Sequence, residues 1–190
     1  MRYSPSFNLL SIDPGSGFGI CISHIDGMTG TMTVIDSISL TIDKAVKLND
    51  DTRWARFTKQ ELIAFYLDDV LTPLLNEHNI DAVIFEAAFH AVSMVAYESL
   101  LFYGRTITSI SKAYDWDILI ESKTPSNVKK LNAVNGTSGD KDLMTKAVRA
   151  NPRIIIPDHI VLDDLTEHAV DAIAIGYCVL HDLMEAIPPS

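Results

Sequence analysis

Two acidic side chains each follow a short apolar run that is typical of a buried strand. Asp13 closes the run Phe7–Asp13 in an Asp-Pro-Gly sequence, and Glu86 directly follows the run Asp81–Phe85. An acid in this position is costly to bury unpaired, so it is usually exposed at a strand tip, hydrogen-bonded or bound to a cation. Either acid alone is best interpreted as a structural turn carboxylate, whereas the two together favour a shared cation site.

A histidine and an aspartate one helical turn apart provide two further candidate ligands. His168 and Asp171 are three positions apart, so they share one face of a predicted C-terminal helix. Their neighbours are small or apolar, which indicates that this face meets protein and not water. A lone histidine on a helix is more often a core or surface residue than a ligand, and the paired aspartate makes a metal site equally plausible.

Together these four residues would form an oxygen-rich cluster with one imidazole. Mg²⁺ prefers carboxylate and water ligands, while an imidazole is tolerated better by Mn²⁺ and other transition metals. Two such ions about 3.5–4 Å apart can hold a phosphodiester and activate water for in-line attack. Because the acids alone would repel a nucleic acid, we expect metal to be required for productive binding as well as for chemistry.

The order of the remaining elements predicts how these distant residues meet. Apolar alternation and turn residues indicate strands, and apolar residues at a spacing of three to four indicate helices. The strands are expected at Phe7–Asp13, Phe18–His24, Thr31–Ile42, Asp81–Phe85 and Trp116–Ile120. The helices are expected at Asp51–His78, Ser93–Ala113, Pro125–Val134 and Asp140–Ala150, and from an N-cap at Asp163 or Asp164 to about Glu185.

This order predicts an α/β fold with a mixed five-stranded sheet, antiparallel in its first three strands and flanked by helices. In such a sheet the first strand is expected beside the fourth, so that their C-terminal ends meet as at a topological switch point. Asp13 and Glu86 would then be neighbours.

Composition and charge narrow the classes of function. The chain has 190 residues, 47% of them hydrophobic, which suits one domain with a proper core. Its net charge of −10 argues against a protein that coats DNA by bulk charge. Residues 122–153 nevertheless hold seven basic and two acidic side chains, a local charge of +5 that leaves −15 for the rest. On charge alone, this segment is equally well a polyanion-binding surface or a solvated helical face.

Apolar runs and cysteines indicate the cellular compartment of the protein. No apolar run approaches the ~20 residues needed to cross a bilayer, and no signal peptide is evident. Cys21 and Cys178 lie in apolar surroundings and are expected to be buried thiols in a reducing compartment. We therefore expect a cytoplasmic protein, in the host cytoplasm if the source is viral, with no membrane partner.

In their order and spacing, the motifs resemble those of the RuvC-type Holliday-junction resolvases, which have the ribonuclease H-like (retroviral integrase-like) fold. The resemblance extends from about Leu9 to Leu183 and implies a single RuvC-like nuclease domain over residues 1–190. Each motif alone is weak, and their combination is fairly specific. The motifs are Ile12-Asp13-Pro14-Gly15, Glu86-Ala87-Ala88-Phe89, Val128-Lys129-Lys130, Gly136-Thr137-Ser138-Gly139-Asp140-Lys141 and His168-Ala169-Val170-Asp171-Ala172-Ile173-Ala174.

The resemblance implies which residues hold metal and meet bases. The family's metal carboxylates map onto Asp13, Glu86 and Asp171, and His168 occupies a position that is Asp in many members and His in others. Phe89 matches a family aromatic that acts on bases near the junction centre, although core packing is an equal alternative on sequence alone.

The resemblance also suggests which basic residues contact DNA. Lys129 and Lys141 resemble the family's basic residues that approach the scissile phosphate, and Lys141 is included among the catalytic residues. Lys130, Lys123 and Arg105 are further candidates for backbone contacts.

The implied activity is structure-selective cleavage of Holliday junctions and related branched DNA in recombination and repair, leaving 5′-phosphate ends. Two Mg²⁺ ions per subunit would be the cofactors, with Mn²⁺ able to substitute. The partners would be a four-way junction and a second copy of the chain. The helix Ser93–Ala113 would carry much of this homodimer interface, although its apolar stripe of Met94, Tyr97, Leu101 and Phe102 is equally consistent with monomer core.

Three other functions compete with this interpretation. One is a broader nuclease that cuts branched DNA or RNA/DNA hybrids. Another is a phosphate-binding ATPase or sugar kinase of the actin–hexokinase type, since the glycine-rich stretch Asp13–Gly19 could be its phosphate loop. Such proteins normally need two domains, and 190 residues argue against this. The third is a catalytically inactive junction-binding protein, against which the four matched site residues speak.

Overall fold

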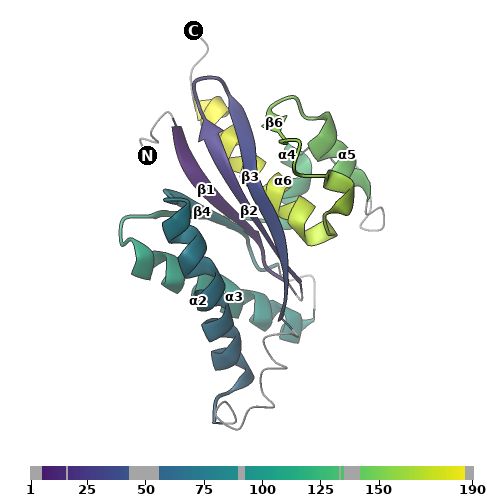
Figure 1. Ribbon diagram of the computed structural model, residues 1–190. Helices are drawn as coiled ribbons and strands as arrows, with labels where there is room; N and C mark the ends of the chain where they lie inside the picture. Colours follow the sequence, from purple (N-terminus) through teal and green to yellow (C-terminus); the bar gives the residue numbers. More distant parts are fainter. Residues whose placement is uncertain are drawn as a thin grey trace.

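The computed structural model describes residues 6–15, 17–42, 56–89, 93–132, 134 and 142–186. Within these ranges the strands form one sheet in the order β5-β4-β1-β2-β3-β6 (Figure 1). The strand bounds are β1 Ser6–Asp13, β2 Gly17–Asp26, β3 Thr31–Thr41, β4 Ala82–Glu86, β5 Leu119–Lys123 and β6 Ile154–Ile155.

The pairing of the strands follows from the lengths of their connections. β1, β2 and β3 are antiparallel neighbours. In the turn after β2, the Asp26 carboxylate accepts hydrogen bonds from the N–H groups of Met28 and Thr29, and Gly30 takes a positive φ of 68°. β4 pairs in parallel with β1 on one side and with β5 on the other. The predicted pairing of the first and fourth strands is therefore confirmed, and Asp13 and Glu86 end adjacent strands at the same edge.

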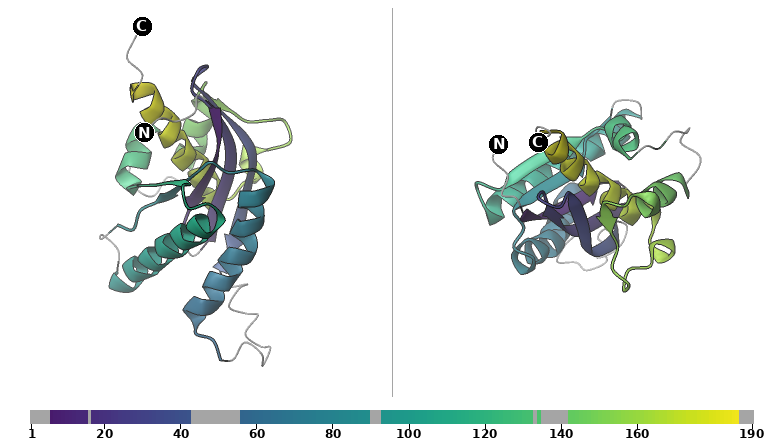
Figure 2. Two further views of the ribbon diagram at one scale, coloured as in Figure 1. Left: turned by 90° about the vertical axis from the view of Figure 1, so that its left-hand side faces the viewer. Right: turned by 90° about the horizontal axis from the view of Figure 1, so that it is seen from above.

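Helices cover both faces of the sheet (Figures 1 and 2). Their bounds are α2 Lys59–Glu77, α3 Met94–Tyr114, α4 Pro125–Leu131, α5 Asp142–Ala150 and α6 Glu167–Ala186. The alternation within β1 sends Leu10 and Ile12 toward α2 and α3, and Leu9 toward α6. α6 packs across β1, β2 and β3, while α4 and α5 pack against α6. Among the described helices, none has the length and apolar character to cross a membrane.

The predicted mixed α/β fold with three antiparallel strands first is confirmed, with two differences in the strands. The sheet has a sixth strand, β6, which is only two residues long and pairs in parallel with β3. β5 begins at Leu119, not at Trp116, whose side chain is 79% exposed. Lys112 explains this later start, because its ammonium donates to the carbonyls of Trp116 and Ile118 and holds the segment as a turn.

The helices differ from the prediction mainly at their ends. The described part of the helix predicted at 51–78 begins at Lys59, where Thr58 and Glu61 form a capping box; residues 51–55 lie outside the described ranges. α4 ends at Leu131, three residues before the predicted Val134. α5 begins at Asp142, and the predicted start at residue 140 lies outside the described ranges.

The last helix begins later than predicted. Asp163 and Asp164 belong to a separate 3₁₀ turn, η2 (Leu162–Asp164), after which Leu165 is extended. The side chain of Thr166 accepts a hydrogen bond from the N–H of Ala169 at 3.3 Å, so Thr166 caps α6. Asp163 instead pairs with Arg149 of α5 at 2.7 Å.

Glycines in β2 allow the N-terminal end of α6 to lie directly on the strand. A Cβ atom at Gly19 would lie 1.8 Å from the carbonyl oxygen of His168, and one at Gly17 would lie 2.7 Å from its ring carbon Cδ2. No heavier residue fits at Gly19 without moving the helix backbone. Packing of α6 therefore explains these two glycines, which the sequence alone could equally assign to a phosphate loop.

Replacing Gly19 should displace α6. The methyl group of Gly19→Ala would meet backbone atoms that no change of rotamer can move. We therefore expect the free energy of unfolding to fall by about 1–3 kcal/mol. Chemical denaturation measures it. Gly15→Ala is the control and should cost less, since its Cβ would lie 3.2 Å from the Gly17 carbonyl oxygen and 3.7 Å from the His168 ring. Wild-type stability of Gly19→Ala would show that α6 is not held against β2.

Candidate active site

Asp13 and His168, 155 positions apart in the sequence, form a hydrogen-bonded pair. Asp13 is the last residue of β1 and is 8% exposed. Its Oδ2 atom accepts a hydrogen bond from Nδ1 of His168, in the first turn of α6, at 2.7 Å. This bond raises the pKa of His168, because the protonated ring is the better partner for a carboxylate.

Glu86 and Asp171 complete the cluster of carboxylates. Burial, and then the charges of Asp13 and Asp171, raise the pKa of Glu86 to about 8. Burial, and then the charges of Asp13 and Glu167, raise the pKa of Asp171 to about 7. Carboxylates affect one another in this way only when they lie close together in a poorly solvated place. The structure thus brings together all four of the predicted ligands.

Two contacts with β3 hold the first turn of α6 in position. The Ser37 hydroxyl is buried and donates to the carbonyl of Ala169, next to His168, at 3.1 Å. The hydroxyls of Ser39 and Thr166 also contact each other. The packing roles of Ser37 and Gly19 could not be predicted from the sequence, because their partners are backbone atoms of a helix far along the chain. Their only signal was small size at inward-facing strand positions.

An open hollow lies beside the carboxylates. It has a volume of about 230 Å³ and is lined by Asp13, Pro14, Glu86, Ala87, Phe89, Leu100 and Pro125. Phe89 is 48% exposed, so its ring lies at the surface of this hollow and not in the protein core. The aromatic ring is therefore accessible to a flat ligand that approaches the carboxylates.

The predicted basic residues do not all reach the cluster. Lys129 is exposed on α4, and its positive charge is near enough to Glu86 and Asp171 to oppose the rise in the pKa of both. Lys130 is exposed on the same helix. Arg105, on α3, lines a wider groove of about 610 Å³ that shares Ala87 and Leu100 with the hollow.

Two further basic residues stand apart. The side chain of Lys123 is only 13% exposed, and its ammonium lies 2.6 Å from Glu121 and 2.5 Å from Asp182. It is therefore satisfied by protein carboxylates and is not presented to a phosphate. Lys141 lies outside the described residues.

The donor atoms suit a divalent cation. Within the described ranges, no group of three or more His, Cys, Asp or Glu side chains is already arranged as a metal-binding shell. Burial, and then the charges of neighbouring carboxylates, disfavour the charged forms of Glu86 and Asp171 and raise their pKa. A hard divalent cation would remove that repulsion, and oxygen donors with one imidazole are ligands that Mg²⁺ or Mn²⁺ accepts. Asp13, Glu86, His168 and Asp171 therefore fit a metal site.

Comparison with solved structures identifies the fold. No protein-family model and no curated protein matches the sequence. RuvC of T. thermophilus, solved in complex with a Holliday junction substrate, matches with a TM-score of 0.64 at 14% identity over 93% of this chain and 96% of that chain. The yeast mitochondrial Holliday junction resolvase matches with a TM-score of 0.66 at 13% identity over 97% of this chain and 82% of that chain.

The chain has a ribonuclease H-like fold. The fowlpox virus Holliday junction resolvase also shares it, with a TM-score of 0.51 at 14% identity over 95% of this chain and 99% of that chain. The resemblance found in the sequence motifs is thus confirmed for the fold over nearly the whole chain. In this ribonuclease H-like fold, the carboxylates of β1, β4 and α6 gather at one edge of the sheet.

The raised carboxylate pKa values predict how stability depends on pH without metal. Glu86 and Asp171 favour the protonated form in the folded chain, so their contribution is complete below the unfolded pKa values of about 4 and is lost as the pH rises through 7 to 8. In chelator, we expect the free energy of unfolding to fall by about 1–3 kcal/mol between pH 5 and pH 8. Chemical denaturation at both pH values measures this.

Glu86→Gln should make that fall smaller, because it removes one of the repelling charges. The matched control is Glu77→Gln, at an exposed position at the end of α2, which should keep the wild-type dependence. The same fall in wild type and Glu86→Gln would mean that Glu86 is not under electrostatic pressure in the folded protein.

Proposed function

We propose that this protein is a metal-dependent endonuclease that cleaves Holliday junctions and related branched DNA in recombination and repair. The observation that supports this most strongly is the convergence of Asp13, Glu86, His168 and Asp171 beside an open hollow with an exposed aromatic at its surface. The fold shared with resolvases of three sources agrees with it.

In the proposed mechanism, two Mg²⁺ ions per subunit, or Mn²⁺ in their place, activate water and neutralise charge on the phosphate. Asp13, which hydrogen-bonds to His168 and whose charge raises the pKa of Glu86 and Asp171, would help to hold both ions. Glu86 and Asp171 would each complete the ligand shell of one ion, and His168 would bind an ion or orient the attacking water. The products would carry 5′-phosphate and 3′-hydroxyl ends.

Other side chains would position the DNA. Lys129, whose charge acts on Glu86 and Asp171, would stabilise negative charge that develops on the phosphate, and Lys141 is a second candidate for this role. Phe89 would stack on a base near the branch point, since every base offers a flat face to an aromatic ring. Lys130 and Arg105 would contact the DNA backbone from α4 and α3.

We further propose that residues 1–190 form one nuclease domain that acts as a homodimer in the cytoplasm. α3 has a buried side, with Tyr103 and Ile107, and an opposite side whose first turn exposes Met94 and Val95. Two copies packed through α3 would cover this apolar surface and place one active site on each of two symmetric strands.

Cleavage assays with defined substrates distinguish this function from its alternatives. We expect a synthetic four-way junction to be cut in Mg²⁺ or Mn²⁺ but not in chelator, and linear duplex to be cut much more slowly. Preferential cutting of an RNA/DNA hybrid would favour the broader nuclease. Hydrolysis of ATP without DNA would favour the ATPase alternative, although α6 packing already accounts for Gly17 and Gly19.

Asp13→Asn should abolish cutting while junction binding is retained. The amide cannot hold two cations, so we expect single-turnover cleavage in Mg²⁺ to fall by at least about 10²–10³-fold. Binding of the junction, measured in Ca²⁺ by fluorescence anisotropy, should change much less. Asp117→Asn, in the exposed turn before β5, is the matched control and should cut normally. Wild-type turnover of Asp13→Asn would remove Asp13 from the mechanism.

Phe89→Ala should impair cleavage without affecting metal binding. Loss of one base–aromatic stack is worth about 1–3 kcal/mol, so we expect junction cleavage to slow by about 10- to 100-fold. Mn²⁺ affinity, measured by calorimetry, should stay the same. The control is Trp116→Ala, another exposed aromatic. Trp116 precedes the start of β5, whereas Phe89 follows the end of the neighbouring parallel strand β4. Unchanged cleavage by Phe89→Ala would exclude a role in base stacking.

A further inference from the structure

Helix α4, which carries Lys129, depends on neighbouring elements for its position. It has seven residues, fewer than an isolated helix needs for stability in water. At its start, the Thr124 side chain accepts a hydrogen bond from the N–H of Asn127. In its middle, Val128 is buried in the core cluster that contains the inward face of α6. These contacts anchor the start and middle of α4, and its end needs a further anchor.

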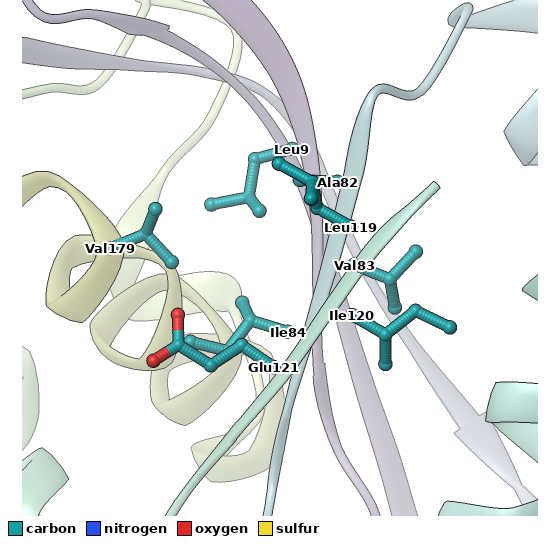
Figure 3. A pocket seen from close by; sticks show the side chains of 8 residues that line it. All are labelled: Leu9, Ala82, Val83, Ile84, Leu119, Ile120, Glu121 and Val179. Atoms are coloured by element: carbon teal, nitrogen blue, oxygen red, sulfur yellow. The ribbon is translucent and has the colours of Figure 1, made fainter. Parts of the chain in front are cut away.

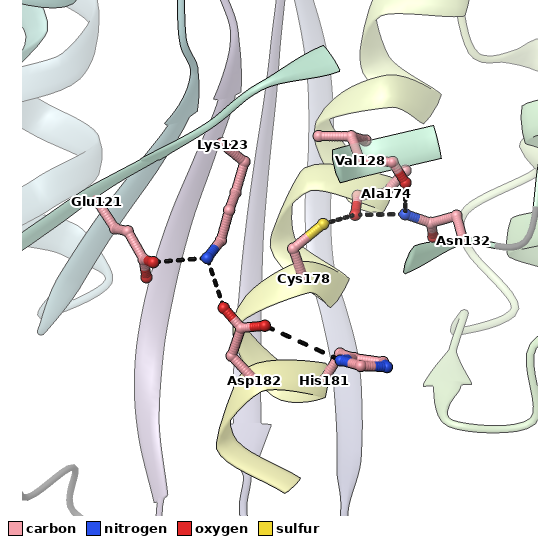
Figure 4. Close-up of polar contacts among 8 residues, drawn as sticks. All are labelled: Glu121, Lys123, Val128, Asn132, Ala174, Cys178, His181 and Asp182. Carbon is pink, nitrogen blue, oxygen red and sulfur yellow. Dashed lines mark hydrogen bonds and ion pairs between the residues drawn. The ribbon is translucent and has the colours of Figure 1, made fainter. Parts of the chain in front are cut away.

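Asn132 provides that anchor at the C-terminal end of α4. It is 6% exposed, and its Nδ2 atom donates to the carbonyl of Val128 at 2.9 Å and to the carbonyl of Ala174 in α6 at 3.0 Å (Figure 4). Its Oδ1 atom has no hydrogen-bond partner among the described residues, so the two Nδ2 contacts orient the amide. The amide of Asn132 thus links the end of α4 to α6, in addition to the packing of Val128.

The carbonyl that Asn132 binds is close to the candidate site. Ala174 follows Asp171 by one helical turn, and Lys129 precedes Asn132 by one turn, so the amide joins the two segments that carry these residues. We propose that Asn132 is a positioning residue for the proposed nuclease reaction: it fixes α4 against α6 so that the Lys129 ammonium faces the carboxylates and the phosphate that they would hold. This inference rests on the proposed function.

A separate ion pair holds the strand that leads into α4. Lys123, the last residue of β5, reaches Asp182 near the C-terminal end of α6 (Figure 4). Between β5 and this part of α6 there is a hollow of about 180 Å³, lined mainly by apolar side chains and by Glu121 (Figure 3). The ion pair ties β5 to α6 through residues other than those to which Asn132 hydrogen-bonds.

A double-mutant cycle tests whether Asn132 acts through Lys129. Asn132→Leu keeps the volume and removes the amide, and Lys129→Gln removes the charge. We expect each to slow single-turnover junction cleavage by about 10- to 100-fold, with little change in DNA affinity for Asn132→Leu. The double variant should be no slower than Lys129→Gln alone, since a misplaced lysine cannot be lost twice. Asn132→Leu combined with Lys130→Gln is the matched control and should show additive effects.

Carbodiimide cross-linking tests the same spacing without DNA or catalysis. In metal-free wild type, it should form an amide between Lys129 and Glu86 or Asp171, as well as between Lys123 and Asp182. Asn132→Leu should lower the yield of the first link several-fold, by mass spectrometry, and leave the second unchanged. If thermal melting shows that Asn132→Leu does not fold, Asn132→Ser replaces it. The serine side chain is too short to bind the Ala174 carbonyl.

These readouts separate the two proposals. Additive effects of Asn132→Leu and Lys129→Gln, or an unchanged Lys129 cross-link, would overturn the positioning role. A wild-type protein that cuts no junction would instead overturn the proposed function, while the cross-link comparison would still decide whether Asn132 places Lys129.

Discussion

Repulsion among carboxylates held close together is the constraint on which the candidate site depends. The backbone positions of Asp13 and Glu86 are set by neighbouring parallel strands, and Asp171 is set by the helix packed across them. Burial and the charges of neighbouring carboxylates raise the pKa of Glu86 to about 8 and that of Asp171 to about 7. The fold thus maintains an electrostatic cost that a divalent cation would relieve.

The rest of the structure serves to hold these acids in place. The parallel ladder of β1 with β4 aligns two strand ends, and the two glycines of β2 let α6 approach until His168 can hydrogen-bond to Asp13. Ser37 and Thr166 then hold the first turn of the helix. The chain has a net charge of −10 but a local excess of basic residues. One of these, Lys129, supplies a positive charge near carboxylates that alone would repel DNA.

Much of this arrangement could be predicted from the order of the elements along the chain. Once the order of strands in the sheet is known, the place of an acid at the end of a strand is known too. Contacts between distant segments could not. Asp163 and Asp164 are typical N-cap residues near the predicted helix start, but they lie in a 3₁₀ turn that ends before α6 begins. The resemblance to the resolvases suggests Lys123 as a DNA contact, yet its ammonium pairs with Glu121 and Asp182. β6 is too short to show a period, and the apolar run at Trp116 is held as a turn by Lys112.

We propose that Asp13, Glu86, His168 and Asp171 together form one site for divalent cations. Anomalous diffraction from crystals soaked in Mn²⁺ tests it most directly, because the metal is located without reference to activity. We predict Mn²⁺ between the Asp13 and Glu86 carboxylates, with Asp171 or His168 completing its ligands. Mn²⁺ bound elsewhere, with these four side chains free of metal at saturating concentration, would contradict the account.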